Sequence, residues 1–135
     1  MKNWLLIAGL LLLFACKNKE DQYHEPENAL DAGREFIQLS LQGKFNSASR
    51  YMLADNDNTF WLDKWSKDFS KISEEEKASF AKASINIAEV DDVVADSVTV
   101  IVFSNSYKKM PQKLKVVKYD GHWKVDFKYT FSGNL

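Results

Sequence analysis

Residues 120–131 read DGHWKVDFKYTF, and this stretch decides the fold class. An Asp-Gly pair is a strong signal for the turn of a β-hairpin. After it, apolar and polar residues alternate with a period of two, which is typical of a strand with one buried and one solvated face. The predicted buried face is Trp123, Val125, Phe127, Tyr129 and Phe131, and the predicted solvated face is His122, Lys124, Asp126, Lys128 and Thr130. A strand with one solvated face belongs to an antiparallel sheet.

Three further strands are predicted before this one. Ile85 and Ile87 recur with a period of two. Residues 98–103 (VTVIVF) are apolar on both faces, and Leu114 and Val116 mark another strand. Together with the last strand, these segments predict a four-stranded antiparallel meander.

Two helices are predicted between residues 26 and 53. Pro26 suits the first turn of a helix, and Gly43 is placed to end it. One apolar face of this helix follows the i, i+3, i+4, i+7 spacing: Ala29, Ala32, Gly33, Phe36, Ile37 and Ser40. A second, short helix is predicted over residues 46–53, with Ala48, Tyr51 and Met52 on its buried side.

A third helix is predicted after a loop at residues 54–58, with Thr59 as its N-cap. Its aromatic and apolar stripe is Trp61, Trp65, Phe69 and Ile72. Ser73 and Glu76 have the spacing of a capping box, so a new helical turn begins there. Phe80 is its predicted core residue.

This order of elements predicts an α+β domain over residues 26–131, followed by a short tail at 132–135. A sheet with one apolar face must be covered, and the N-terminal helices are the only cover that the chain offers. The expected architecture is a curved four-stranded antiparallel sheet that wraps a long helix. A cystatin-like arrangement, with one main helix over the sheet, is the alternative.

The N-terminus has the pattern of an export signal. Residues 1–3 form a short positive region, and residues 4–14 form an apolar run of eleven residues. A membrane-spanning helix needs about 20 residues, so this run fits the core of a signal peptide. Residues 13–16 (LFAC) resemble the lipobox of bacterial lipoproteins, with Phe14 bulkier than the residue usually found there.

The resemblance implies that residues 1–15 are removed and that Cys16 becomes a lipidated N-terminus. Residues 16–25 then form a polar tether between the lipid and the domain. Several acyl chains give stable anchoring, because each buried CH₂ contributes about 0.8 kcal/mol. We therefore expect a lipid-anchored protein of the bacterial cell envelope, with the outer membrane as the favoured location.

The composition excludes several classes of partner and chemistry. The chain has 18 Lys and Arg against 19 Asp and Glu, a balance that gives no electrostatic reason to expect nucleic acid as a partner. Cys16 is the single cysteine, so no internal disulfide and no cysteine nucleophile is expected.

Two segments of the domain carry a family resemblance. Residues 32–51 read AGREFIQLSLQGKFNSASRY and residues 117–126 read VKYDGHWKVD. Together they resemble a family of small bacterial lipoproteins of unknown function whose domain was once labelled lumazine-binding-like. That family is similar to the nuclear transport factor 2-like superfamily of cone-shaped α+β folds. The resemblance covers most of residues 26–131 and implies no catalytic residue.

A ligand cavity is the candidate site of such a cone. The residues that could line it are Tyr51, Trp61, Trp65, Trp123, Tyr129 and Glu89. Plain core packing is the more frequent role of an aromatic stripe at helical spacing. Glu89 continues the face of Ile85 and Ile87; the exposed end of the strand is its favoured place, and a cavity acid is the alternative.

No metal site and no cofactor are predicted. Residues 55–58 (DNDN) suggest a calcium loop, but an EF-hand needs Gly at its sixth position and Glu at its twelfth, where this chain has Phe60 and Ser66. His24 and His122 have no Cys, Asp or Glu at ligand spacing in sequence, so both are expected at the surface.

The predicted function is a non-catalytic envelope module that binds a small apolar ligand or an envelope protein. Aromatic residues are good platforms for such partners, and acid–base chemistry needs a titratable group in a dry site, which the predicted apolar faces almost lack. The alternative is an isomerase- or dehydratase-like enzyme that uses a carboxylate in the cone cavity.

Replacing Cys16 with Ser tests the lipid anchor. The acyl chains have no other attachment point, so the variant should move from the membrane fraction to the soluble or unprocessed fraction. Fractionation of cells and the mass of the mature chain measure this. Cleavage and membrane partition identical to those of the parent chain would contradict the lipoprotein prediction.

Overall fold

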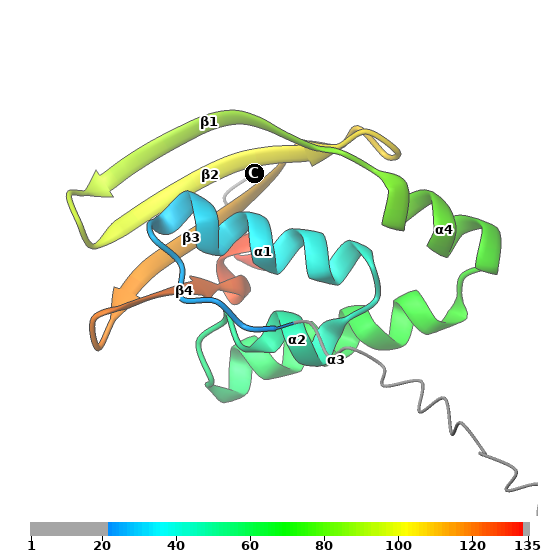
Figure 1. Cartoon of the computed structure of the whole chain (residues 1–135), viewed down its shortest axis with the longest axis horizontal. Helices are drawn as coiled ribbons and strands as arrows, with labels where there is room; N and C mark the ends of the chain where they lie inside the picture. Colours follow the sequence, from blue (N-terminus) through cyan, green and yellow to red (C-terminus); the bar gives the residue numbers. More distant parts are fainter. Residues whose placement is uncertain (1–21, 134–135) are drawn as a thin grey trace, which may run out of the picture.

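The domain is a helical layer packed on an antiparallel sheet (Figure 1). A computed structural model describes residues 22–133. The elements are α1 (Ala29–Leu41), α2 (Phe45–Ser49), α3 (Asn56–Lys71), α4 (Glu74–Lys82), β1 (Ile85–Val94), β2 (Val98–Asn105), β3 (Gln112–Tyr119), β4 (His122–Asp126) and the 3₁₀ helix η1 (Phe127–Phe131). The strand order β1-β2-β3-β4 confirms the predicted α+β class and four-stranded antiparallel meander.

Two predicted segments lie, wholly or in part, outside residues 22–133. The signal peptide of residues 1–15 and the lipidation site Cys16, with the first part of the tether, lie outside the described residues. Residues 134 and 135 of the predicted tail lie outside them as well.

Helix α1 crosses the inner face of the sheet and contacts all four strands (Figure 1). Gly33 permits the close approach, because a Cβ at this position would lie 2.8 Å from Cδ1 of Ile101. The predicted start at Pro26 was wrong: the helix begins at Ala29, because Asn28 adopts an extended conformation and its side chain accepts a hydrogen bond from the N–H of Asp31 at 2.9 Å.

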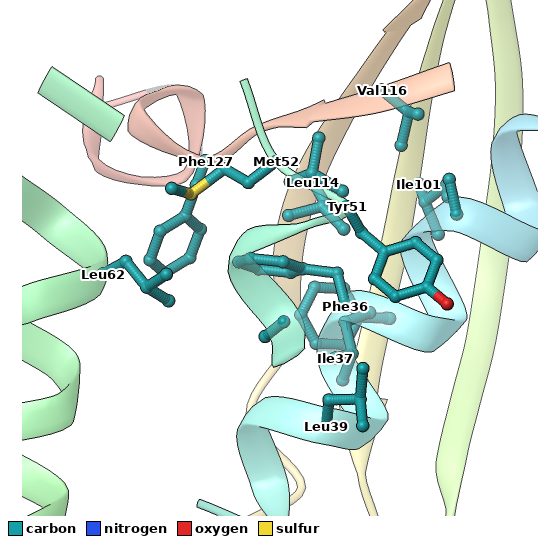
Figure 2. Close-up of a cluster of buried hydrophobic side chains, with 14 of the residues drawn as sticks. Phe36, Ile37, Leu39, Tyr51, Met52, Leu62, Ile101, Leu114, Val116 and Phe127 are labelled. Atoms are coloured by element: carbon teal, nitrogen blue, oxygen red, sulfur yellow. The ribbon is translucent and has the colours of Figure 1, made fainter. Parts of the chain in front are cut away.

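The core lies between α1 and the sheet (Figure 2). Its largest fully buried apolar side chains are Phe36, Ile37, Ile101, Leu114, Val116 and Val125. Burial of a side chain of this size stabilises the fold by about 1.5–3 kcal/mol. Phe36 meets Phe127 edge to face with ring centroids 5.0 Å apart, so the core continues from the helix into η1.

The second helix is shorter than predicted. It ends at Ser49 because the next residues pair with β4 instead of continuing the helix. The N–H of Val125 donates to the carbonyl of Tyr51 at 2.7 Å, and the N–H of Leu53 donates to the carbonyl of Val125 at 2.9 Å. This pairing fixes α2 and the segment after it beside the sheet.

Helix α3 begins earlier than predicted. Asp55, not Thr59, is its N-cap, and its carboxylate accepts a hydrogen bond from the N–H of Asn58 at 2.8 Å. Residues 56–58 of the predicted loop are therefore the first turn of α3, whereas residues 54 and 55 precede the helix. Ser73 caps α4 as expected, because its hydroxyl accepts a hydrogen bond from the N–H of Glu76 at 3.2 Å.

The hairpin turn before β4 is formed as predicted. Asp120 and Gly121 have φ angles of 50° and 77°, and a two-residue type I′ turn requires positive φ at both positions. The strand that follows is shorter than the alternation predicts. β4 ends at Asp126, and the chain turns into η1, so Phe127, Tyr129 and Phe131 do not extend the strand.

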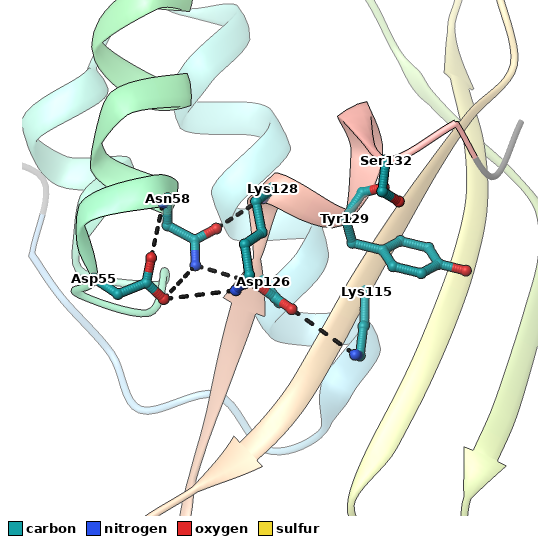
Figure 3. A network of polar contacts seen from close by, with 7 residues as sticks. All are labelled: Asp55, Asn58, Lys115, Asp126, Lys128, Tyr129 and Ser132. Carbon is teal, nitrogen blue, oxygen red and sulfur yellow. Dashed lines mark hydrogen bonds and ion pairs between the residues drawn. The ribbon is translucent and has the colours of Figure 1, made fainter.

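A buried polar network ends the strand (Figure 3). The fully buried Asn58 accepts a hydrogen bond from the N–H of Lys128 at 2.8 Å and donates to the carboxylate of Asp126 at 3.1 Å. The hydroxyl of Thr130 donates to the carbonyl of Lys113 at 2.7 Å. After Asp126, the side chains of Asn58 and Thr130 therefore bind backbone groups that a continued strand would have paired with a neighbouring strand. Asp126 and Thr130 take part in these contacts and are buried, whereas the sequence predicted both on the solvated face.

Replacing Asn58 with Ala should lower the free energy of unfolding by about 2–4 kcal/mol. The substitution leaves the N–H of Lys128 without its acceptor and the buried carboxylate of Asp126 without one donor, and an unsatisfied buried group costs about 1–3 kcal/mol. Urea unfolding measures the change. Asn56→Ala in the same helical turn is the matched control, because that side chain is exposed, and an equal loss in both variants would contradict the role of the network.

The network also predicts loss of stability in acid. The backbone N–H and the side chain of Asn58, with Lys128, hold the pKa of Asp55 below its usual value. A carboxylate with a lowered folded pKa stabilises the native state above its unfolded pKa of about 3.9, and the contribution is lost as the pH falls through the folded pKa. The difference in unfolding free energy between pH 7 and pH 3 should therefore be smaller in Asp55→Asn, which can still cap the helix.

Asp57→Asn is the control for this measurement. It removes a carboxylate from the same turn but not one that caps α3. If both substitutions reduce the difference in unfolding free energy between pH 7 and pH 3 equally, the loss of one negative charge explains the change. The hydrogen bonds to Asp55 would then not be its cause.

Candidate functional site

An apolar cavity of about 440 Å³ lies between α3, α4 and the end of the sheet that carries η1. Its apolar lining is Ile37, Leu41, Trp61, Trp65, Phe80, Phe103, Met110, Phe127 and Phe131. Its polar lining is Lys64, Asp68, Asn105, Lys108, Gln112 and Thr130. Sites for small molecules enclose about 300–1,000 Å³ and combine mainly apolar walls with a few polar groups.

One wall is formed by α3 and η1. Trp61 stacks flat on Phe131, with ring centroids 4.0 Å apart and an interplanar angle of 7°. Trp65, one helical turn later, lies 5.5 Å from the ring of Phe127. Trp61 and Trp65 of the predicted aromatic stripe thus line the cavity and also pack against the core. Phe69, the next residue of the stripe, contacts Phe45 and Phe80 instead.

Another part of the lining comes from α4 and β2. Phe80 packs edge to face against Tyr107, with ring centroids 4.9 Å apart and planes at 88°. Phe103 projects from the inner face of β2 and is buried. Phe80 therefore lines the cavity in addition to packing against the core, which is the role predicted from the sequence.

The charged groups of the cavity lie on α3 and on the loop after β2. Lys64 donates to the carboxylate of Asp68 at 3.1 Å, and Lys71 lies 3.6 Å from the same carboxylate. The hydrogen bond from Lys64, with the charges of both lysines, holds the pKa of Asp68 below its usual value. Asp68 therefore stays ionised near neutral pH. Lys108 lies over the ring of Tyr107, 4.9 Å from its centroid.

The mouth of the cavity has exposed apolar side chains. Met110 is 66% exposed and Phe131 is 43% exposed, and both also line the cavity. An apolar surface that continues from a cavity to its rim is typical of a binding site rather than of a packing defect. No sequence pattern pointed to Met110, because it lies in a loop without periodicity.

Of the predicted cavity residues, Trp61 and Trp65 line this cavity, and Trp61 also lines a separate, more open hollow with Tyr129. Tyr51 is buried beside the segment that precedes α1. Trp123 lies on β4 with the ammonium group of Lys118 5.5 Å from its ring centroid. Tyr129 lies on η1, where the ammonium of Lys115 is 5.6 Å from its ring centroid.

Glu89 does not continue the inward apolar face of β1. Ile87 pairs with Phe103, but Glu89 pairs with Val102, so Ala88 forms a β-bulge. One extra residue moves the side chains that follow to the other face of the sheet. Glu89 is therefore exposed on the edge strand and is not among the residues that line the cavity.

The two histidines have carboxylate partners that sequence spacing did not predict. Nδ1 of His122 lies 2.6 Å from the carboxylate of Glu25. Nε2 of His24 lies 3.4 Å from the carboxylate of Asp31, and Glu35 completes a group whose ligand atoms all lie within 4.8 Å of one another. The group could hold a metal ion, whereas the sequence predicted none.

Comparison of the chain with protein-family models, with curated proteins and with solved structures found no match. Within residues 22–133, no helix combines the length and the apolar character needed to span a bilayer.

Proposed function

We propose that this chain is a lipid-anchored protein of the bacterial cell envelope whose domain binds a small, mainly apolar ligand. The observation that carries the proposal is the aromatic cavity beside α3 and η1. Its volume suits a small molecule, and its walls offer ring faces for an apolar or ring-containing body. Membrane attachment through Cys16 is part of the proposal and rests on the sequence.

The polar groups of the cavity favour a ligand with one polar end. Asn105 on β2, Lys108 in the loop after it and Gln112 on β3 lie at one end of the sheet, while the aromatic residues lie mainly on α3 and η1. Lys64 and Asp68, the polar lining residues on α3, are paired with each other. A ligand can therefore place its apolar body against Trp61 and Trp65 and its polar end toward these residues.

The arrangement of charges disfavours the enzyme alternative. Among the described residues, Asp68 is the carboxylate that lines the cavity, and its pairing with Lys64 and Lys71 keeps it ionised. An isomerase or dehydratase needs a titratable group placed against its substrate with a pKa suited to proton transfer. Glu89, the acid considered from the sequence, lies on the edge strand. Turnover of an enolisable ketone that is lost in Glu89→Gln would restore the enzyme alternative.

We also propose that this fold belongs to the nuclear transport factor 2-like superfamily. Support comes from helices on the inner face of a curved four-stranded sheet, with a cavity between them at one end. The cystatin-like alternative has one main helix over its sheet, whereas here α3 and α4 form a wall of the cavity in addition to α1. The family of small bacterial lipoproteins remains a resemblance of residues 32–51 and 117–126.

Filling the cavity tests the proposed function. A fragment of residues 22–133 contains the described core, and N-phenyl-1-naphthylamine is a neutral apolar probe whose fluorescence rises in apolar sites. Leu41→Phe adds volume at the cavity wall, so it should weaken binding of the probe by about fivefold or more, equivalent to about 1 kcal/mol. Fluorescence titration gives the affinity.

Leu39→Phe is the matched control. Leu39 lies on the same helix but lines a separate hollow beside Tyr51, so this substitution should leave binding of the probe unchanged. Circular dichroism of both variants verifies folding. Binding that is absent in the parent chain, or equal in all three proteins, would contradict the proposed cavity.

A further inference from the structure

Three potential metal ligands meet where the N-terminal segment reaches α1. His24 comes from the segment before the helix, and Asp31 and Glu35 come from α1 itself. Residues four apart lie on one face of a helix, so both carboxylates point to the same side. One ligand atom from each of the three side chains lies within 4.8 Å of the other two, a spacing that one cation can bridge.

Within residues 22–133, the ion pair of these two carboxylates is the contact of Asp31 with His24. Within the described part of the chain, no Lys or Arg lies within ion-pair distance of Asp31 or Glu35. Like charges four residues apart destabilise a helix by about 0.2–0.5 kcal/mol. A bound cation would remove this repulsion.

The ring of His24 is oriented for ligation through Nε2. The hydroxyl of Tyr51 lies 3.5 Å from Nδ1 and also accepts a hydrogen bond from the backbone N–H of His24 at 3.3 Å. Nε2 faces Asp31 at 3.4 Å. In metal sites, the ring nitrogen that does not bind the metal usually donates a hydrogen bond that fixes the tautomer and the ring.

The supporting residues are themselves fixed. Tyr51 is 2% exposed, and its ring is held by the ring of Tyr23, 5.0 Å away between centroids. The carboxylate of Asp31 accepts a hydrogen bond from the N–H of Glu27 at 3.0 Å, as carboxylate ligands usually do from a neighbouring group. The side chain of His24 is 50% exposed, which leaves a path from solvent to the site.

We propose that His24, Asp31 and Glu35 form a binding site for a divalent transition-metal ion, with Zn²⁺ as its test ion. One imidazole nitrogen and two carboxylate oxygens are ligands that Zn²⁺ accepts, and a water can take the fourth position. Ca²⁺ and Mg²⁺ prefer sites built from oxygen alone. The site is independent of the ligand cavity.

The ion would join the segment before α1 to the helix. His24 lies within the predicted tether, and both other ligands belong to the folded domain. The segment already contacts the domain through Tyr51, Asp31 and His122, so metal binding would add a further link between His24 and α1. The predicted consequence is a segment that is held more firmly against α1 when the ion is bound.

Calorimetric titration of the full chain in nonionic detergent with Zn²⁺ tests the site. One ion per chain should bind, and His24→Ala and Glu35→Gln should each weaken the affinity at least tenfold, because each removes a ligand. Tyr51→Phe should weaken it by about tenfold, as loss of a supporting hydrogen bond does. Titration with Ca²⁺ in place of Zn²⁺ should give much weaker binding.

His122→Ala and Glu27→Gln are the matched controls. The first removes the other histidine, which pairs with Glu25, and the second removes a neighbouring carboxylate outside the group. Both should keep the affinity of the parent chain. No binding of Zn²⁺ to the parent chain, or binding that His24→Ala and Glu35→Gln leave unchanged, would overturn the proposal. Circular dichroism verifies that each variant is folded.

Discussion

The amide of Asn58 is the contact on which the shape of this domain depends. It joins the first turn of α3 to the end of β4, because it binds the carboxylate of Asp126 and the backbone N–H of Lys128 together. An N–H that is bound by a side chain is not available to a neighbouring strand, so the ladder ends here. The chain then turns into η1 instead of extending the sheet. A single buried amide thus sets both the length of the last strand and the position of a helix 68 residues away in sequence.

The ligand cavity is a consequence of that turn. If the last strand had continued, Phe127, Tyr129 and Phe131 would all have lain on one face of the sheet, with Tyr129 between the two phenylalanines. As a 3₁₀ helix, the segment instead brings Phe127 and Phe131 to the same wall as Trp61 and Trp65. At the rim of the cavity, Met110 and Phe131 remain exposed.

The N-terminal segment contacts the domain through the side chains of Tyr23, His24 and Glu25. His122 on β4 contacts Glu25, and His24 lies against Asp31 on α1. The ring of Tyr23 packs on Tyr51 with centroids 5.0 Å apart. If Cys16 carries the lipid, these contacts set how the domain is held at the membrane, and the proposed metal ion would act on the same segment.

The sequence by itself determined the elements that depend on near neighbours. The α+β class, the Asp120-Gly121 turn, the aromatic stripe of α3 and the cap at Ser73 follow from periods and spacings within a few residues. The tertiary structure alone decided where β4 ends, on which face Glu89 lies and which groups surround His24. Each of these depends on a partner remote in sequence. The amide of Asn58 ends β4, the register with β2 sets the face of Glu89, and the hydroxyl of Tyr51 contacts His24. Local patterns carry no information about such partners, because a hydrogen bond between remote segments forms only after packing has brought them together.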